Sequence, residues 1–229
     1  NTFLNFTASH DGIGVRPLEG ILSQGETEHL IEIVKQNGGD VSYKTNPDGS
    51  QSPYELNITY VDALMDKNTD NDPYHVQRFL ASQAIQLSLP GIPAVYIHSI
   101  LGSRNWKAGL SQTGRARTIN REKLDMNSML SDLEDPDSFR SRIFFPYLRM
   151  IRIRREQPAF HPNAGFEILD TDPRVFAIKR YCKSQAIYAL TNISSSPVSV
   201  SLSGTQASCP MTDLFTRESF DTDSFRLNP

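Results

Sequence analysis

The chain has 229 residues, of which 38% are hydrophobic, and a formal net charge of −3 at pH 7. This length and composition are typical of a globular protein with one large domain, or a domain and a small satellite. The nearly balanced charge excludes a broad basic surface for nucleic acid, and no apolar run reaches the roughly 20 residues that span a bilayer. The two cysteines, Cys182 and Cys209, have no metal-ligand spacing. We therefore expect no metal site, no disulfide framework and a cytoplasmic location.

The first segment, FLNFTASHDGIGVRP at residues 3–17, is an apolar run that ends in a polar pair. Residues 3–7 are typical of a strand buried on both faces of a parallel sheet. His10 and Asp11 follow at its tip. A strand that only packs a core has no use for two polar side chains there, so the pair either caps the loop or meets a ligand.

Helical patterns follow this strand. Ser23 and Glu26 have the spacing of a capping box before an apolar stripe at residues 30–34, and Gly38-Gly39 predicts the helix end. Asp72 is the expected N-cap of a second helix that ends at residues 90–91. Residues 40–72 between them are polar, and we expect an inserted loop with a turn at residues 47–49. A third helix is predicted from residue 135 to about residue 157.

The later strands are of two kinds. IPAVYIHSILG, residues 92–102, is a second buried-strand run, and strands alternating with helices favour a parallel α/β sheet. From residue 166 the short alternating runs FEIL, VFAIKRY, AIYALTNI and PVSVSLS predict a small antiparallel β domain. The expected organisation is therefore an α/β part over residues 1–160 and a β domain over residues 161–229.

Five motifs in this chain order resemble one enzyme family. They are FLNFTASHDGIGVRP, SPYELNITYVDAL, LPGIPAVYIHSILGSRN, RTINREKL and RIRREQPAFHP. Together they are similar to the second half of sucrose phosphorylase-type enzymes of the α-amylase superfamily, in the glucosylglycerate and sucrose 6-phosphate phosphorylase branch. The resemblance extends to about residue 162, and beyond it the similarity is only that of a C-terminal β domain.

The resemblance implies the C-terminal portion of a (β/α)8 barrel, with residues 3–7 as its seventh strand and residues 92–97 as its eighth. Catalytic groups of this fold lie at the C-terminal ends of the strands, where His10 and Asp11 would then sit. Asp11 matches the family's third carboxylate, which binds glucosyl hydroxyls and stabilises the transition state. His10 would donate a hydrogen bond to the same sugar.

Four further residues are expected to bind substrate. Tyr54 matches a tyrosine that alternates between phosphate and the leaving sugar, and Glu55 departs from the family's Gln, which puts plain sucrose in doubt. Arg117 matches an arginine that holds the sugar ring, and Asn105 is expected in the pocket-lining loop after the eighth strand. Tyr54 could instead pack the loop, and Arg117 could belong to a solvated basic stretch. The resemblance assigns no role to three nearby residues, His98, Trp106 and Thr118.

The implied reaction is the phosphorolysis of an α-glucoside, sucrose-like or glucosylglycerate, to α-glucose 1-phosphate by a retaining double displacement. Inorganic phosphate is the co-substrate and no cofactor is expected. The nucleophile and the acid/base would lie upstream, so the chain corresponds to about half of an enzyme and is expected to be inactive alone. Exposed barrel edges would be covered by the missing N-terminal half or by a second copy. Alternatives are a hydrolase or transglucosylase of the same superfamily, or a non-catalytic carbohydrate-binding module.

Overall fold

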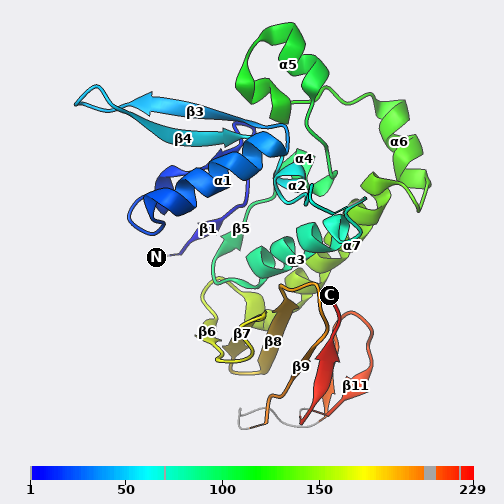
Figure 1. Cartoon of the computed structure of the whole chain (residues 1–229). Helices are drawn as coiled ribbons and strands as arrows, with labels where there is room; N and C mark the ends of the chain where they lie inside the picture. The colour runs from blue at the N-terminus through cyan, green and yellow to red at the C-terminus, as the bar shows by residue number, and fades with distance from the viewer. Residues whose placement is uncertain (1, 70, 204–209, 222) are drawn as a thin grey trace. The chain divides into compact units, whose positions relative to one another are not determined.

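The computed structural model describes residues 2–69, 71–203, 210–221 and 223–229, which fall into two compact units. The mixed unit comprises residues 6–79 and 94–146, and the C-terminal unit comprises residues 1–5, 80–93 and 147–229. Helices α3 (His75–Ser88) and α7 (Phe139–Glu156) each contribute residues to both units. The elements are labelled in Figure 1, and each unit is described by itself.

The mixed unit is built on a three-stranded antiparallel sheet in the order β2–β4–β3. The sheet strands are β2 (Ile13–Gly14), β3 (Asp40–Thr45) and β4 (Gln51–Asn57). Helix α1 (Gln24–Gln36) lies alongside the β3–β4 hairpin (Figure 1). The core of this unit is apolar and is formed by Val15, Val34, Val41, Leu56 and Ile58. Burial of these apolar side chains between the sheet and α1 therefore holds the sheet in place.

Short helices complete the mixed unit. They are η1 (Arg16–Leu18), α2 (Tyr60–Ala63), α4 (Ile97–Ile100), α5 (Lys107–Thr113), η2 (Ala116–Asn120) and α6 (Met126–Glu134). The predicted capping box is confirmed, because the Ser23 hydroxyl accepts from the backbone N–H of Glu26 while the Glu26 carboxylate accepts from that of Ser23. The N-cap role predicted for Asp72 is wrong. Its φ of 29° is not the extended conformation of a cap, and its carboxylate accepts from the backbone N–H of Asp66 instead.

Residues 40–57, expected to be loop, form the β3–β4 hairpin, with the predicted turn at residues 47–49. The hairpin contains a β-bulge. Ser42 pairs with Glu55 but Tyr43 pairs with Pro53, so Tyr54 is the extra, unpaired residue of β4. A bulge re-aims the side chains beside it, and Pro53 favours one because it has no N–H to give to the ladder.

The C-terminal unit contains β1 (Leu4–Asn5) and β5 (Ile92–Pro93), which pair in parallel, as expected for neighbouring strands of the predicted barrel. The strands are shorter than the predicted 3–7 and 92–97, and residues 97–100 form α4 instead. The ladder extends over two register pairs, and extended backbone without a partner does not remain a strand. Leu4 is 63% exposed and Ile92 is 47% exposed, so this pair leaves apolar surface uncovered in the described part of the chain.

The remainder of this unit is the predicted antiparallel β region. After η3 (Pro158–Phe160), the sheet β6–β7–β8 packs against the β9–β12 pair through a core that includes Val175, Ala177, Val198 and Val200. A further hairpin pairs β10 with β11. The strands are β6 (Gly165–Ile168), β7 (Val175–Cys182), β8 (Gln185–Asn192), β9 (Val198–Val200), β10 (Met211–Thr212), β11 (Ser219–Phe220) and β12 (Phe225–Leu227).

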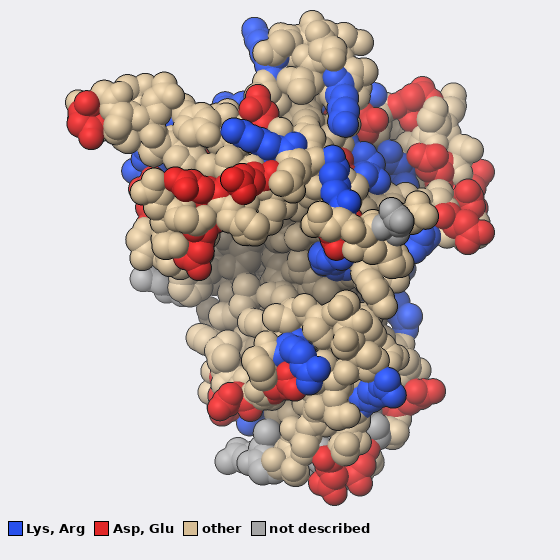
Figure 2. Space-filling view, viewed as in Figure 1, with Lys and Arg blue, Asp and Glu red and all other residues tan. Residues whose placement is uncertain are grey.

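Charges of both signs are interspersed over the face seen in Figure 2. Acidic side chains gather over α6 and the residues next to it, and no broad basic surface appears in this view. None of the helices described has both the length and the apolar character needed to cross a bilayer. Cys209, one of the two cysteines, lies outside the described residues.

Candidate functional site

The His10-Asp11 pair sits at the tip of a tight turn between Ser9 and Gly12. The backbone N–H of each of these two residues donates to the carbonyl of the other, at 3.0 and 3.2 Å. Gly12 has a φ of 127°, and a Cβ on it would lie 2.2 Å from the carbonyl oxygen of Leu56. Only glycine fits, because any side chain would be strained and would collide with β4. The turn therefore fixes the position of Asp11 through backbone geometry.

Among the described residues, the side-chain contacts of the Asp11 carboxylate all involve one of its oxygens, Oδ1. Nη2 of Arg121 donates to Oδ1 at 2.7 Å, and Nη1 of Arg117 lies 3.5 Å from the same atom. Nε2 of the exposed His10 is also 3.5 Å from Oδ1. Oδ2 has no hydrogen-bond partner among the residues that the structure describes. The carboxylate is therefore anchored on one side and available to a ligand hydroxyl on the other.

Arg117 joins Asp11 to Glu55. Its Nε and Nη2 both lie 2.9 Å from Oε2 of Glu55, which is 8% exposed on β4. The Glu55 carboxylate raises the pKa of the Arg117 guanidinium by direct charge attraction. The pair neutralises a carboxylate that would otherwise be costly to bury. The structure thus brings together four of the predicted site residues, His10, Asp11, Glu55 and Arg117.

Tyr54 adjoins this group as the bulged residue of β4. Its carbonyl oxygen accepts from the backbone N–H of Val15 at 3.2 Å, which ties the bulge to the segment after β2. The side chain is 38% exposed and adds a small contribution to the raised pKa of Arg117, after the larger ones from Glu55 and Asp11. Tyr54 is therefore anchored through its backbone while its ring remains open to a ligand.

Asn105, also predicted to bind substrate, holds structural elements together. Its Oδ1 accepts from the backbone N–H and the hydroxyl of Thr59, at 2.9 and 3.1 Å. Its Nδ2 donates to the carbonyl of Asn37 at 3.1 Å, and its backbone N–H donates to Asp62 at 2.7 Å. The amide thus links the end of α1 to the start of α2. Its role in substrate binding stays a prediction.

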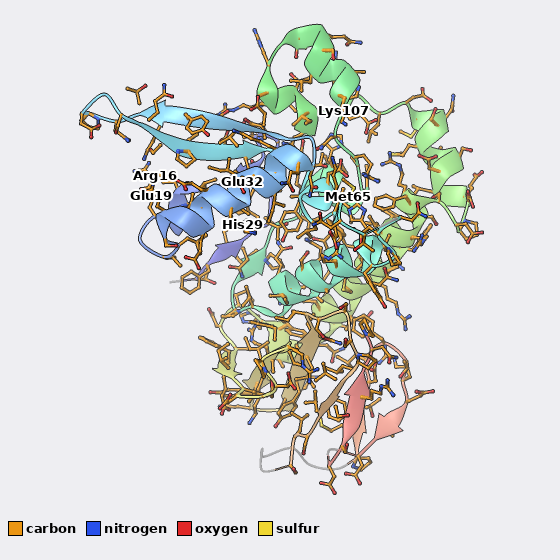
Figure 3. All side chains as sticks on the ribbon, in the orientation of Figure 1. Arg16, Glu19, His29, Glu32, Met65 and Lys107 are labelled. Carbon is orange, nitrogen blue, oxygen red and sulfur yellow. The ribbon has the colours of Figure 1, made fainter. Side chains whose placement is uncertain are left out.

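Neighbours of Asn105 tie the same elements together. Arg104 donates to the buried Asp62 carboxylate, and the amide of Asn37 donates to the carbonyl of Met65 at 2.8 Å. Figure 3 labels Met65 after α2 and Lys107 at the start of α5. A Cβ on Gly38 would lie 3.4 Å from Nζ of Lys107, so this cation sits beside the C-terminal end of α1, where a positive charge is favoured.

The three residues without an assigned role are held by neighbours in the mixed unit. Nδ1 of His98 lies 2.9 Å from the hydroxyl of Ser103. Burial lowers the pKa of His98, and Arg140 lowers it further. The backbone N–H of Trp106 donates to the carbonyl of Ile119 at 3.0 Å. Thr118 shares a 2.8 Å hydroxyl–hydroxyl bond with Thr113.

Sequence reasoning missed two residues that hold Asp11. Arg121 binds both the carboxylate and, through Nε, the carbonyl of His10 at 3.1 Å. Asn57, which is fully buried, donates from Nδ2 to the carbonyl of Asp11 at 3.0 Å. Arg121 lies inside the motif RTINREKL and Asn57 inside SPYELNITYVDAL, and the presence of these polar side chains in recognised motifs was the available signal. Nδ2 of the buried Asn120, next to Arg121, has no hydrogen-bond partner among the described residues.

Two cavities lie away from this cluster. One of about 520 Å³ is bordered by η1, α1 and the hairpin, with Glu19 at its rim, labelled with Arg16 in Figure 3. The other, of about 510 Å³, lies wholly in the C-terminal unit and is lined mostly by apolar side chains, with Arg154, Gln185 and Asp213 among the polar ones. Neither is lined by Asp11 or Arg117. In the described ranges, no three His, Cys, Asp or Glu side chains come together as metal ligands.

Comparison with known proteins confirms the resemblance to sugar phosphorylases. The chain is 46% identical over 195 residues to a glucosylglycerate phosphorylase of Spirochaeta thermophila, covering 84% of this chain and 33% of that protein. It is 44% identical over 179 residues to the glucosylglycerate phosphorylase of Escherichia coli, covering 78% and 32% respectively. The chain thus spans about a third of the length of these curated relatives. No protein-family model matches it.

Solved structures confirm the fold. The sucrose 6F-phosphate phosphorylase of Thermoanaerobacter thermosaccharolyticum matches 99% of this chain with a TM-score of 0.68 at 22% identity, over 41% of its own length. An Anoxybacillus α-amylase matches 75% of the chain with a TM-score of 0.54 at 16% identity, over 33% of its own length. The chain therefore shares its fold with the matched parts of these two enzymes.

Proposed function

We propose that this chain supplies part of the glucosyl-binding site of a sugar phosphorylase, with Asp11 as the carboxylate that faces the sugar. The observation that carries the proposal is the Asp11 carboxylate itself, with Oδ1 held by Arg121 at 2.7 Å and Oδ2 without a partner in the described chain. A free carboxylate oxygen accepts sugar hydroxyls, and its charge stabilises an oxocarbenium-like transition state. His10 would donate to the same sugar.

The reaction proposed for the longer protein is retaining phosphorolysis. A nucleophilic carboxylate outside this chain takes the glucosyl group as the glycosidic bond breaks, and a general acid protonates the leaving oxygen. An oxygen of inorganic phosphate then attacks the glucosyl carbon, releases the carboxylate and gives α-glucose 1-phosphate. The nucleophile and the general acid of such a mechanism lie about 5 to 5.5 Å apart. In this proposal Asp11 is neither of them, because it binds the sugar hydroxyls, and Glu55 is paired with Arg117.

The acceptor side would be formed by Tyr54 and Glu55, while Arg117 would hold the sugar ring. Glu55 accepts from Arg117, which removes the repulsion that a bare carboxylate would exert on an anionic acceptor. Glucosylglycerate is the first substrate to test, because relatives at 44 to 46% identity are named for it. The place of Asn105 in a pocket-lining loop stays a prediction, as does a cytoplasmic location.

The exposed apolar residues of the β1–β5 pair favour a covering partner. Leu4 and Ile92 are among the exposed large apolar residues of the C-terminal unit. Strands with an unpaired edge and an exposed apolar face tend to pair with a further strand. We propose that preceding strands of a longer chain cover them, and that this chain expressed alone associates with a second copy. A monomer by light scattering would count against this association.

The test uses a protein of phosphorylase length that contains this chain. Sucrose, sucrose 6-phosphate and glucosylglycerate are supplied in turn with inorganic phosphate, and glucose 1-phosphate is measured. We expect product from at least one of them and a loss of about 100-fold or more in Asp11→Asn. Asp137→Asn is the matched control and should keep full activity, because this exposed carboxylate forms no hydrogen bond or ion pair with the described residues.

Three results would change or overturn the proposal. Release of free glucose at the same rate with and without phosphate indicates a hydrolase of the same superfamily. Glucoside binding without any turnover in the phosphorylase-length protein indicates a carbohydrate-binding module. Full activity of Asp11→Asn removes Asp11 from the reaction.

A further inference from the structure

We propose that Arg121 is the positioning residue that sets the orientation of the Asp11 carboxylate; the inference rests on the proposed function, in which Asp11 faces the sugar. Arg121 contacts Asp11, in the turn between Ser9 and Gly12, from a segment 110 positions further along the chain. It acts through Asp11 and needs no contact of its own with substrate.

One guanidinium holds two consecutive residues of the turn. Nη2 donates to Oδ1 of Asp11 at 2.7 Å, and Nε donates to the backbone carbonyl of His10 at 3.1 Å. The donors of a guanidinium are fixed in one plane, so the two bonds define both the direction of the main chain and the rotation of the side chain. A lysine ammonium is a point charge and cannot set both at once.

Arg121 is itself held by a rigid segment. It directly follows η2, in which Ile119 is 1% exposed and Asn120 is 3% exposed. The hydroxyl of Tyr96 donates to the carbonyl of Asn120 at 2.7 Å, and the backbone N–H of Arg121 donates to Thr118 at 2.9 Å. The side chain therefore extends from an anchored backbone although it is itself 45% exposed.

The two arginines of this segment have different tasks. Nε and Nη2 of Arg117 are directed at Glu55, and the distance from Arg117 to Asp11 is 3.5 Å. Arg121 makes the short bond to Asp11 and leaves Oδ2 open. Loss of Arg121 would let the carboxylate turn toward Arg117, which would then compete with the sugar for both oxygens.

A double-mutant cycle in the phosphorylase-length protein separates this role from a merely structural one. We expect Arg121→Ala to lower kcat/KM by about 10- to 100-fold, mainly through kcat, with an unchanged melting temperature. In the Asp11→Asn background the same substitution should cost less than about twofold, because the group that it positions is gone. Arg121→Lys should fall between wild type and Arg121→Ala. Arg115→Ala is the matched control, since the side chain of this exposed arginine in the same segment forms no hydrogen bond or ion pair with the described residues.

Equal losses in both backgrounds, or full activity of Arg121→Ala, would overturn the inference. Where Asp11→Asn leaves too little turnover, dissociation constants for glucose by calorimetry supply the same cycle. A crystal structure of Arg121→Ala decides the positioning claim without any activity. We expect the Asp11 carboxylate to rotate or to occupy several conformers, and an unmoved carboxylate contradicts the inference. Failure of the proposed function is distinct, because it shows as absent glucose 1-phosphate from the unsubstituted protein.

Discussion

Nε and Nη2 of Arg117 converge on a single oxygen of Glu55, each at 2.9 Å. Glu55 is almost fully buried, whereas the Arg117 side chain is 44% exposed, so the pair presents a largely neutralised guanidinium to solvent. Any anionic group that approaches this surface meets a charge that Glu55 has already partly cancelled. The affinity for phosphate should therefore depend on Glu55 even without direct contact.

Glu55→Gln should lower the KM for phosphate in the phosphorylase-length protein by about two- to fivefold, because Arg117 then keeps its full charge for the anion. The same change should lower kcat, since a neutral amide orients the guanidinium less firmly. Initial rates at varied phosphate measure both, and the KM difference should shrink at high salt. Glu32→Gln, on the exposed side of α1 (Figure 3), serves as the control. A raised KM would contradict the prediction.

Tyr54→Phe tests the bulged residue of β4. The ring is 38% exposed, so removal of the hydroxyl should change the free energy of unfolding by less than about 0.5 kcal/mol. If the hydroxyl binds phosphate or the leaving sugar, kcat/KM should fall about tenfold, the value of one hydrogen bond to a charged group. Tyr43→Phe, in the same hairpin and 47% exposed, is the control. Similar activity of the two variants would leave Tyr54 with a packing role.

The sequence predicted those helices and strands whose formation depends on residues close to one another in the chain. The capping box at Ser23 and Glu26 satisfies helix-end donors within four residues, so α1 was readable from spacing alone. The alternating runs of β7 and β8 were readable because side chains of a strand alternate between two faces. Asp72 was misread because the pattern of a cap does not reveal that its carboxylate has a better partner in the N–H of Asp66.

Site residues could be predicted from the sequence only where a recognised motif gave them a role. Asp11, Glu55 and Arg117 were named and lie together, but the bond from Arg121 to Asp11 spans 110 positions and has no local signature. Asn105 shows the opposite difficulty. An amide in a loop binds a sugar or its own backbone with the same atoms, and only the fold shows that here it bonds to Thr59 and Asn37.

Asn105→Ala should destabilise the protein, because it leaves the N–H and hydroxyl of Thr59 and the carbonyl of Asn37 without their partner. We expect the free energy of unfolding to fall by about 2 kcal/mol in urea denaturation. Asn127→Ala, at an exposed position of α6, should change it by less than about 0.5 kcal/mol. A stable Asn105→Ala variant with impaired substrate binding would instead support the predicted role at the sugar.

Arg180→Met probes the most buried charge of the C-terminal unit. Arg180 is fully buried on β7, and burial lowers the pKa of its guanidinium. It donates to four backbone carbonyls, those of Ser88, Leu89, His161 and Gly165. Methionine fills similar volume but satisfies none of them, so we expect a loss of about 3 kcal/mol in unfolding free energy. Arg155→Met, exposed on α7, should cost less than about 0.5 kcal/mol, and equal effects would contradict the prediction.

His98→Gln should weaken the dependence of stability on pH. Burial, followed by the charge of Arg140, lowers the pKa of His98 in the folded protein, so the unfolded chain takes up its proton first as the pH falls. The stability that comes from burying the neutral ring is therefore present above the ordinary histidine value and is lost as the pH falls through it. Glutamine keeps a polar partner for the Ser103 hydroxyl but does not titrate. Urea denaturation at about pH 7.5 and about pH 5.5 should show a larger loss for the unsubstituted chain than for His98→Gln. His29→Gln, at an exposed position, is the control. An equal loss of stability between the two pH values in the unsubstituted chain, in His98→Gln and in His29→Gln would show that His98 is not responsible.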